Sequence, residues 1–516
     1  MLKSKVFNIV LPLIILFSII SSLISFYPLL ISGPKAVFFN FEPEVAYVAN
    51  ALSYIGFKEI SYAGHPATPS ILSIATSFIP LRLYAKYIDH IPFFLWTIRN
   101  EFFLFYYVRV LESLIFTGAV AVFLYSIYKL TKNVWSVVFG WSGLFVYTNT
   151  AYLGIIPQSE PLSFLIISIW LLVFVYFLQR KKFNLYLILC ILAGLSVANK
   201  LPNMFFVLAS VGQVLSFNRI KFKKKLLYIL TGTLSSVFAF FLATWQIRSQ
   251  YQSLWQWILQ LATHTGVHGG GEESVINLSA HLNSLTTLFS LERAAAVLIL
   301  STLLFWIISL KKRERAFNIP INILVTSMFL GILVFGKFSL SHYHQFHYVA
   351  LLFIASYLSS KLNKGGYWVF LTLLLVFSIK SIVGYWNINV SETRKAIALE
   401  EFVQKNPPKV ATVWEWGRSS DYALLHIQDW VGIRYTTYLK PERPNLFSLS
   451  TDMSKVVIFP GETKDVFSQC WDQLYIQKSE FNRFINKYPK AKLSIIAIDG
   501  SKDMLLITSS HCLKSK

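Results

Sequence analysis

Long runs of apolar residues, separated by short polar junctions, cover most of the first 390 positions of this 516-residue chain. A helix needs about 20 consecutive apolar residues to cross a bilayer. By this measure the pattern predicts eleven transmembrane helices. Their windows are residues 7–31, 102–128, 133–153, 158–179, 184–199, 201–218, 226–246, 293–310, 319–336, 345–360 and 366–387.

The first window has some features of a signal peptide, because it follows Lys3 and Lys5. Its apolar run is longer than the roughly 7–15 residues of a signal-peptide core, and no small-x-small cleavage site precedes Gly33. We therefore interpret it as an uncleaved first span.

Basic residues gather on one side of the predicted bundle. With the N-terminus in the cytoplasm, the junctions on that side carry eighteen Lys and Arg residues and the single acid Glu314. The short connections on the opposite side contain only Lys337, and Lys200 stands in a turn between two spans. This asymmetry follows the positive-inside rule. The segments then expected outside the cytoplasm are 33–101, 247–292 and 388–516.

The first outer loop is long and is expected to hold two helices lying along the membrane surface. Residues 44–52 have helical periodicity after Pro43, which favours a helix start. Residues 66–84 are apolar but interrupted by prolines and an arginine, as in an interfacial helix and unlike a span.

The tail differs in composition from the rest of the chain, because charged residues return there. Residues 456–459 and 493–498 are short apolar runs typical of strands, and 391–403 has a helical pattern. The predicted fold class is therefore an all-α polytopic membrane bundle (residues 1–390) followed by a small extracytoplasmic α/β domain (residues 391–516).

Outside the cytoplasm Cys470 and Cys512 can form a disulfide, since disulfides persist in oxidising compartments. Cys190 lies within a predicted span and cannot join them.

Composition narrows the class of protein further. Of all residues 55% are hydrophobic and only 14% are charged, and the mean hydropathy is +0.53, whereas soluble domains carry roughly a quarter charged residues. A soluble enzyme is therefore excluded. The net charge of +22 would suggest a nucleic-acid partner in a polar chain, but here much of the excess lies at the predicted cytoplasmic junctions.

Three acids lie where the predicted outer surface meets the membrane. Glu42 and Glu44 follow the first span, and Glu160 stands at the start of the fourth. A partly desolvated carboxylate can act as a general base. Each acid also has a simpler explanation, because a negative side chain stabilises a helix N-terminus.

Basic side chains are found in the same region. Lys200 is a candidate for anion binding, with snorkelling to the surface as the alternative. Arg109 is an intramembrane cation early in the second span, and Glu112, one helical turn on, would be its structural partner. His65 precedes Pro66 in the first outer loop, where a turn before a helix is the alternative.

Two histidine-containing segments complete the set of candidates. His264 and His268 lie in a glycine-rich outer loop, which would otherwise be a flexible gating loop. Lys337 precedes His342 and Tyr343 before the tenth span. The histidines there could bind a metal, but Lys337 would repel a cation, so a phosphate-binding cluster fits the charges better.

Taken in their order along the chain, these features resemble those of the GT-C membrane glycosyltransferases. Within that group they are most similar to the branch of protein mannosyltransferases and lipid A aminoarabinose transferases. The shared features are an uncleaved first span, an acid followed by Tyr in a long outer loop, a His-Pro element, a later Ser-Glu, a lysine after a small-residue helix, and a Lys followed by His-Tyr. Each motif alone is weak, and their order with consistent sidedness carries the resemblance. It covers about residues 1–390 and does not extend to the tail.

The resemblance implies a polyprenyl-phosphate-linked sugar donor and transfer with inversion on the extracytoplasmic face. It identifies the loop acid with Glu44, followed by Tyr47. The family usually has Asp or Asp-Glu in this loop, whereas this chain has Glu42-Pro43-Glu44, so Glu42 is the alternative base. The other residues that match the family's motifs are His65, Glu160, Lys200, Lys337, His342 and Tyr343.

The chemistry of such a transfer is consistent with these residues. An acceptor hydroxyl must lose a proton as it attacks, which calls for a carboxylate base. The leaving phosphate gains charge, which nearby cations stabilise, and the candidates for this role are Lys200, Lys337, Arg109 and His342.

The resemblance assigns no cofactor with certainty. Some family members need a divalent metal, and the lack of an Asp-x-Asp motif favours metal-independent catalysis. The expected partners are the lipid-linked donor, membrane lipids and an acceptor that is a lipid, a glycan or a protein, with no nucleic acid. The sugar and the acceptor stay open, as does the source, although a bacterial or archaeal cell membrane is favoured over the endoplasmic reticulum.

The alternative function is a polytopic transporter or flippase for a lipid or lipid-linked sugar. Such proteins commonly contain inverted repeats with polar sites at the bilayer midplane. This chain shows neither, and its polar residues cluster at the outer boundary instead. A scaffold that only displays the tail would not need eleven spans.

Overall fold

The computed structural model divides into two compact units, which are described separately. Unit 1 comprises residues 1–26, 62–70 and 112–385, and unit 2 comprises 27–61, 71–111 and 386–516. The residues that the structure describes are 2–33, 44–56, 58–60, 67–217, 220–264, 273, 278–310, 315–335, 341–362, 364–459, 462–499, 501 and 503–509.

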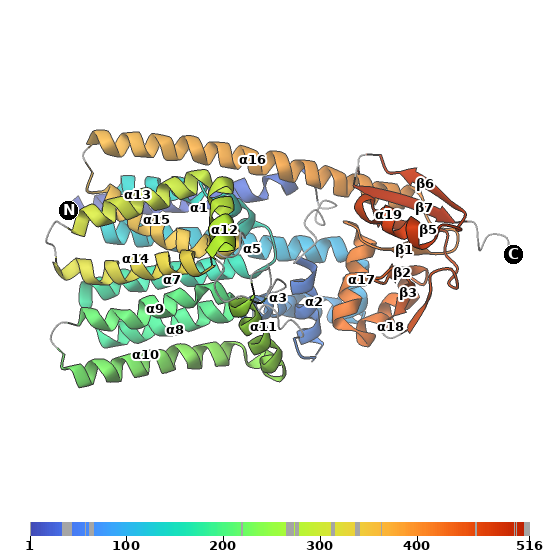
Figure 1. Cartoon of the computed structure of the whole chain (residues 1–516), viewed down its shortest axis with the longest axis horizontal. Helices are drawn as coiled ribbons and strands as arrows, with labels where there is room; N and C mark the ends of the chain where they lie inside the picture. Colours follow the sequence, from blue (N-terminus) through green and yellow to red (C-terminus); the bar gives the residue numbers. More distant parts are fainter. Residues whose placement is uncertain are drawn as a thin grey trace. The chain divides into compact units, whose positions relative to one another are not determined.

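Each of the eleven predicted apolar windows falls on a helix (Figure 1). These helices are α1 (Leu2–Ser32), α5 (Glu101–Thr131), α6 (Val134–Leu144), α7 (Ser159–Arg180), α8 (Phe183–Asn199), α9 (Met204–Gly212), α10 (Phe222–Ala243), α13 (Arg293–Leu310), α14 (Arg315–Phe335), α15 (Gln345–Ser359) and α16 (Lys364–Lys405). Helices α1, α5 and α16 also contribute residues to unit 2. Two further helices of unit 1 are α11 (Tyr251–Thr263) and α12 (Leu278–Leu291).

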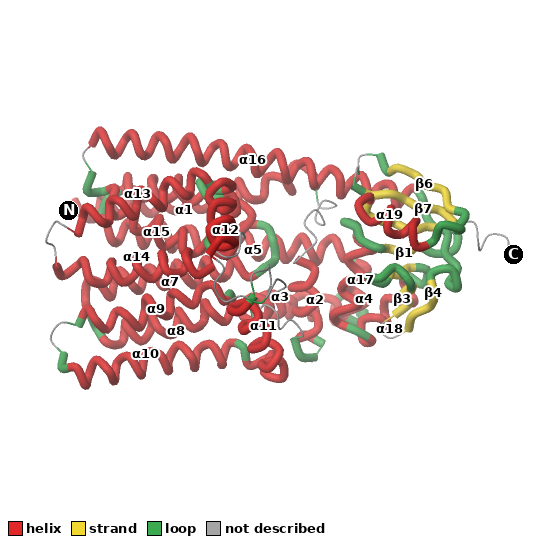
Figure 2. Tube along the Cα trace, viewed as in Figure 1, coloured by secondary structure: helices red, strands yellow, loops and turns green. Residues whose placement is uncertain are grey.

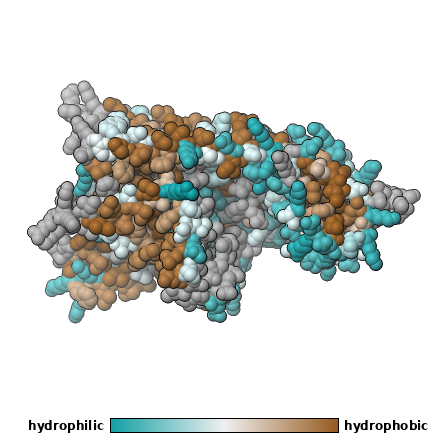
Figure 3. Space-filling model, turned by 45° about the horizontal axis from the view of Figure 1, so that its top comes forward, coloured by the Kyte–Doolittle hydropathy of each residue, from teal (hydrophilic) through white to brown (hydrophobic). Residues whose placement is uncertain are grey.

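Among the described residues, five helices are long and apolar enough to cross a membrane: α1, α5, α7, α10 and α16. The other six are shorter apolar helices. In α10 only 17% of the apolar window is buried, so most of its apolar side chains face outward. Figure 3 shows hydrophobic residues widely exposed over the helical bundle. A surface of this kind belongs in lipid, which makes the chain a multi-pass membrane protein, while the number of crossings stays a prediction.

Two windows differ from single straight spans. Window 133–153 contains α6, which is 11 residues long, followed by a 3₁₀ helix at Thr148–Gly154. Helix α6 begins where the Asn133 side chain accepts a hydrogen bond from the amide of Trp135, a common way for a helix to start. Window 201–218 is α9 flanked by 3₁₀ turns.

Small residues bring α8 and α10 close together in unit 1. Gly194 of α8 faces the backbone of Ser236 in α10, and the Ser236 hydroxyl donates to the carbonyl of Cys190 at 2.8 Å. Gly232 of α10 lies against the Tyr186 side chain. Small residues allow such close backbone approach between membrane helices, where hydrophobic burial gives little drive.

The described part of the first outer loop contains three helices: α2 (Glu44–Ile55), α3 (Thr68–Tyr87) and α4 (Phe93–Arg99). The first two were predicted, and α4 was not. Residues 44–53 of α2 are buried inside the protein, and the position of α2 and α3 along the membrane surface stays a prediction. Helix α2 packs against α17 (Ser420–Val431) of the tail.

Polar contacts join the first outer loop to the tail within unit 2. The ammonium of Lys58 donates to the carbonyl of Val431 at 3.1 Å. The Arg434 guanidinium binds the carbonyl of Gly56. Arg99 of α4 pairs with Glu442 at 2.6 Å. The first outer loop and the tail therefore lie on the same side of the membrane, and the extracytoplasmic assignment of that side stays a prediction.

The described strands all follow α16 in the chain and form one seven-stranded sheet of order β4-β3-β2-β1-β5-β7-β6 (Figure 2). They are β1 (Thr412–Trp414), β2 (Leu446–Leu449), β3 (Lys455–Phe459), β4 (Glu462–Asp465), β5 (Gln473–Gln477), β6 (Leu493–Ala497) and β7 (Met504–Ser509). Strands β2, β1 and β5 are parallel, and the outer pairs are antiparallel. Strands β3 and β6 confirm the two predicted from the sequence.

Helices cover both faces of this sheet. Val413 and Leu474 point to a core that includes Phe484 of α19 (Lys478–Lys487). Their neighbours Trp414 and Tyr475 point to the opposite core, with Leu399 of α16. Residues alternate between the faces of a strand, so short strands supply two cores. The predicted helix at 391–403 is the end of α16, which is 42 residues long.

The remaining helix of this region is α18 (Ile433–Glu442), which follows α17 directly. Gly432 between them has φ of +73°, a conformation that glycine adopts without steric cost. Cys470 is disulfide-bonded, and Cys190 is a free, buried thiol. The expected partner of Cys470, Cys512, lies outside the described residues.

The α8–α10 contact gives a test of the bundle. A Cβ at Gly194 would lie within 3.0 Å of three backbone atoms of Ser236, whereas one at Gly118 of α5 would meet nothing within 4 Å. We expect Gly194→Ala to cost about 1–3 kcal/mol and to lower the thermal midpoint of the detergent-purified protein. Gly118→Ala should leave it unchanged or raise it, because Ala favours a helix interior. Equal midpoints for the two variants would contradict the close packing.

Candidate active site

A buried ion pair joins the first outer loop to the second predicted span within unit 2. Glu44 is the first residue of α2, and its Oε2 accepts a hydrogen bond from Nη2 of Arg109 in α5 at 2.5 Å. The side chains are 1% and 0% exposed, respectively. The other carboxylate oxygen, Oε1 of Glu44, has no hydrogen-bond partner among the described residues. One oxygen is thus held in place, and the other is left to accept a proton.

The protonation of Glu44 reflects two opposing effects. Burial raises the pKa of Glu44 to about 8, and the Arg109 guanidinium opposes that rise. A carboxylate in a low-dielectric site is a stronger base than one in water. Its position at the N-terminus of α2 adds the favourable end of the helix dipole. Glu44 therefore does stabilise a helix N-terminus, as the simpler explanation from the sequence has it. The ion pair with Arg109 is an additional contact, which stabilising a helix end does not require.

Tyr47, which the resemblance places beside the loop acid, lies three residues after Glu44 on α2 and is 2% exposed. Residues three apart on a helix share a face. The structure therefore places Glu44 and Tyr47 together. Glu42, the alternative base, lies outside the described residues, as does His65.

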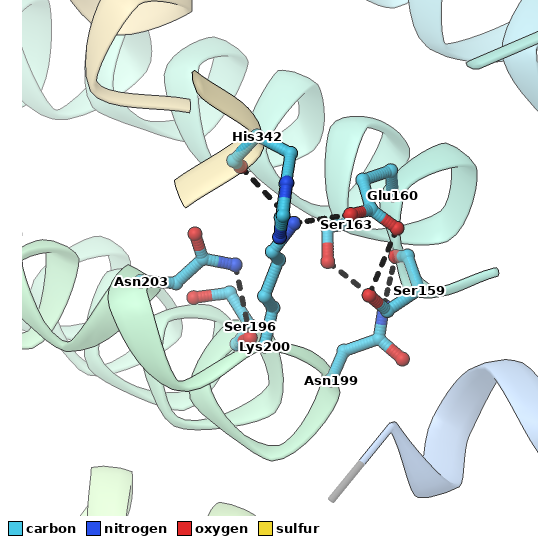
Figure 4. Close-up of polar contacts among 8 residues, drawn as sticks. All are labelled: Ser159, Glu160, Ser163, Ser196, Asn199, Lys200, Asn203 and His342. Carbon is cyan, nitrogen blue, oxygen red and sulfur yellow. Dashed lines mark hydrogen bonds and ion pairs between the residues drawn. The ribbon is translucent and has the colours of Figure 1, made fainter. Parts of the chain in front are cut away.

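A second buried ion pair lies in unit 1, where α8 ends (Figure 4). Lys200 caps α8, and its ammonium binds Oε1 of Glu160 at the start of α7. It also donates to the backbone carbonyl of His342 at 3.1 Å. The side chain of Lys200 is 0% exposed, and that of Glu160 is 7% exposed. The snorkelling alternative for Lys200 is therefore wrong, and Glu160 is more than a helix cap.

Neighbouring polar groups fix this pair from several elements. The Ser159 hydroxyl donates to Oε2 of Glu160 at 3.0 Å. Asn199 donates to the carbonyl of Ser159 at 2.6 Å and to the Ser163 hydroxyl at 2.8 Å. Oδ1 of Asn199 accepts from the amide and the hydroxyl of Ser70 in α3, at 3.0 and 2.8 Å. The network ties the ends of α3, α7 and α8 to one another around Lys200.

The segment containing the predicted His-Tyr motif completes this cluster. His342 and Tyr343 form a 3₁₀ turn at Ser341–Tyr343, immediately before α15. Tyr343 is 3% exposed, and its ring contacts that of Phe335 at 6.4 Å. The structure thus brings Lys200, Glu160 and His342 together, as candidates from three distant parts of the chain. Lys337, from the same motif, lies outside the described residues.

The second histidine loop is only partly described. His264 ends α11, forms a backbone bridge with Glu273 and has its ring nitrogen Nδ1 2.9 Å from the Thr263 hydroxyl. His268 lies outside the described residues. Within the described ranges, no three His, Cys, Asp or Glu side chains gather closely enough to hold a metal ion.

Two members of these clusters were not predicted from the sequence, and one residue, Glu112, was predicted to have the wrong partner. Asn199 and Ser163 are central to the network around Lys200, and only the position of Asn199 directly before Lys200 pointed to it. Glu112 was expected to pair with Arg109, but the ion pair of Arg109 is with Glu44. Glu112 is buried, its Oε2 has no hydrogen-bond partner among the described residues, and it interacts electrostatically with Glu160.

The chain is similar in fold to known structures, although its sequence matches no family. No protein family model and no curated protein matches the sequence. The solved structures similar in fold include two of ArnT from Cupriavidus metallidurans. The structure bound to undecaprenyl phosphate has a TM-score of 0.53 at 11% identity and covers 96% of this chain and 98% of its own. The apo structure has a TM-score of 0.52 at 12% identity, covering 96% and 97%.

The chain has the GT-C fold. The resemblance drawn from the sequence is confirmed at this level, and the likeness extends further than expected, because 96% coverage includes most of the tail.

The pair of Lys200 and Glu160 gives a test by paired substitution. Removing one partner of a buried ion pair costs about 3–5 kcal/mol, because an uncompensated charge stays buried. We expect Glu160→Gln and Lys200→Met each to lower the thermal midpoint strongly, and the double variant to lose much less than the sum of the two. Thermal unfolding of the four purified proteins measures this coupling. Strictly additive losses would show that the two side chains do not interact.

Proposed function

We propose that this protein is an integral membrane glycosyltransferase that uses a polyprenyl-phosphate-linked sugar. The observation that carries the proposal is the likeness in fold to ArnT over 96% of the chain, in a structure that contains undecaprenyl phosphate. The two buried ion pairs support it, because isolated charges in a membrane protein are costly and mark functional sites.

The proposed reaction is a single displacement on the extracytoplasmic face. The acceptor hydroxyl oxygen attacks the anomeric carbon while the bond from that carbon to the phosphate oxygen breaks. The polyprenyl phosphate leaves with the electron pair, and the hydroxyl proton passes to the enzyme. One displacement inverts the configuration at the anomeric carbon.

In this proposal Glu44 is the general base. Its Oε1 has no hydrogen-bond partner among the described residues, and Arg109 holds the other oxygen. A pKa near 8 suits a base that must accept a proton and release it again near neutral pH. Arg109 acts as a positioning residue for this carboxylate.

Lys200 is proposed to stabilise the leaving phosphate. An ammonium has three N–H groups, and the contacts with Glu160 and the His342 carbonyl use two. The third can donate to a phosphate oxygen whose charge grows in the transition state. Glu160 positions the ammonium. The sequence resemblance is the basis on which we propose substrate-binding roles for Tyr47, His65, Lys337, His342 and Tyr343. The same role is proposed for His264 and His268 because they lie in a glycine-rich outer loop.

The positive-inside pattern supports the proposed orientation, with a cytoplasmic N-terminus and the first outer loop and tail on the extracytoplasmic face. A bacterial or archaeal cell membrane is the proposed location. The acceptor is a lipid, a glycan or a protein.

The proposal is tested by transfer assays on the protein in liposomes with synthetic lipid-linked sugars as donors. We expect sugar transfer to an acceptor and release of the polyprenyl phosphate. Movement of the intact lipid-linked sugar across the bilayer without its consumption would instead show a flippase.

The base assignment predicts the effect of removing the Glu44 carboxylate. Since general-base catalysis contributes about 10²–10⁴-fold, we expect Glu44→Gln to lower the transfer rate at least about 100-fold. Glu401→Gln is the control, because Glu401 is half-exposed on α16 and pairs only loosely with Lys405, at 3.8 Å. The double variant Glu44→Gln/Arg109→Met removes both buried charges, and should recover stability but not activity. Recovery of transfer in the double variant would show that Glu44 has a structural role only.

The raised pKa of Glu44 predicts a pH dependence. A base must be deprotonated to act, and below its pKa the deprotonated fraction rises tenfold with each pH unit. We therefore expect kcat/KM to increase from mildly acidic pH to about 8 and then to level off. The residual rate of Glu44→Gln should lack this rise. A wild-type rate that is flat between mildly acidic and neutral pH would contradict the assignment.

A further inference from the structure

The tail contains a cleft at a position where α/β sheets commonly bind ligands. Strand β1 lies in the middle of the parallel part of the sheet, with β2 on one side and β5 on the other. The chain leaves β1 through α17 and α18 to reach β2, and later returns to β5 on the opposite side. The connections thus diverge at the carboxyl end of β1. In open sheets a crevice at this position is the usual binding site.

A cavity of about 470 Å³ lies there within unit 2, and sites for small ligands are roughly 300–1,000 Å³. Glu415 and Trp416, which directly follow β1, line it together with Ser450 beyond β2 and Gln477 at the end of β5. The cavity is therefore built from the ends of all three parallel strands.

Aromatic side chains form one wall of this cleft. Trp416 and Tyr422 have ring centroids 6.4 Å apart, and Tyr422 stacks with His426 at 6.3 Å and 25°. Tyr422 and His426 both lie on α17, one helical turn apart. On Trp416 the guanidinium of Arg418 lies 5.6 Å from the ring centroid, and Arg418 is itself held by Glu392. The ring of Trp416 is thus fixed by its surroundings before any ligand arrives.

The local backbone explains why Trp416 takes this position. A Cβ at Gly417 would collide with the ring of Trp414 beneath it, so the chain can turn over the sheet only because residue 417 is glycine. Helix α17 then starts with Ser419 as its cap, and Glu400 of α16 binds both the amide and the hydroxyl of Ser420, at 3.0 and 2.9 Å. The N-terminus of α17 is therefore already satisfied by a carboxylate and is not an anion site.

The charges of the cleft determine the class of ligand. Among the described lining residues are the acids Glu415, Asp429 and Glu480, the cation Arg483, which pairs with Glu480 at 3.2 Å, and one histidine. One oxygen of Glu415 accepts from the amide of Gln477 at 3.1 Å, which holds the carboxylate at the rim. A net negative lining disfavours phosphates and other anions. Carboxylates and hydroxyls beside flat aromatic rings instead suit a neutral ligand with hydroxyl donors on one face and C–H groups on the other.

We propose that this cleft binds a neutral saccharide and that it holds the glycan part of the acceptor. Binding of a saccharide in the cleft does not depend on catalysis. The statement that this saccharide belongs to the acceptor rests on the proposed transferase function. Sugar rings stack on Trp416 and Tyr422, and their hydroxyls donate to Glu415 and Glu480. The acceptor class is thereby a glycan or a glycolipid whose sugar part reaches the tail.

The binding test uses the full-length protein in detergent and calorimetric titration with soluble oligosaccharides of mannose, glucose, galactose and N-acetylglucosamine. We expect at least one series to bind, and Trp416→Ala and Tyr422→Ala each to weaken that binding about tenfold. Trp416→Phe should retain most of the affinity, since the aromatic face remains, and Glu401→Gln should retain all of it. Thermal midpoints identify any variant that has simply lost its fold.

Transfer assays run in parallel separate the two proposals. Saccharide binding without any transfer would leave the cleft standing and overturn the transferase. If transfer occurs, Trp416→Ala is expected to raise the KM for a glycan acceptor about tenfold with little change in kcat. Absence of binding by all four series, binding that is equal in Trp416→Ala, or preferential binding of peptides would each overturn the saccharide cleft.

Discussion

A charged side chain can remain in an apolar interior only if a partner compensates the loss of hydration, because leaving one partner of such a pair alone costs several kcal/mol. Among the residues that the structure describes, the pairs of Glu44 with Arg109 and of Lys200 with Glu160 meet this requirement. Each joins segments that are far apart in sequence: α2 with α5, and the end of α8 with the start of α7. The positions of these helix ends therefore depend on the pairs, and the pairs depend on the helices that exclude water from them.

Burial also changes what these residues can do chemically. An acid at a membrane surface, as the sequence suggests for Glu44, would be only partly desolvated. In the structure α2 is covered by α17 of the tail, and the carboxylate is almost fully buried. The tail thus packs against the helix that begins with Glu44, although the two are separated by more than 300 positions.

The cavity that we propose as a binding site in the tail differs in chemistry from the two buried ion pairs. The bundle offers few buried charges among apolar side chains, which suits a lipid phosphate. The carboxyl ends of β1, β2 and β5 offer aromatic rings and carboxylates in a cavity, which suits a hydroxylated and water-soluble group. A protein that joins a lipid-borne sugar to a glycan needs both environments in one chain.

Periodicity and charge by themselves determined most of the architecture. Apolar runs located all eleven apolar helices, because a helix that faces lipid must be apolar over most of its length. Short apolar runs located β3 and β6. Glu160, Lys200 and His342 were among the residues selected because their order along the chain resembles that of a known family. The family resemblance, drawn from the order of these residues, agrees with the observed fold.

The contacts between residues that are distant in the sequence became known only from the tertiary structure. The sequence offered Glu112 as the partner of Arg109 because it is one turn away, but the ion pair forms with Glu44, 65 positions away. Ser163 gave no signal in the sequence, and Asn199 gave only its position directly before Lys200, since amides and hydroxyls are common near helix ends. The cleft at Trp416 could not be predicted from the sequence either, because it forms only where the ends of β2, β1 and β5 lie side by side. Local pattern fixes which faces of an element are apolar, whereas pairing depends on how long-range packing brings those faces together.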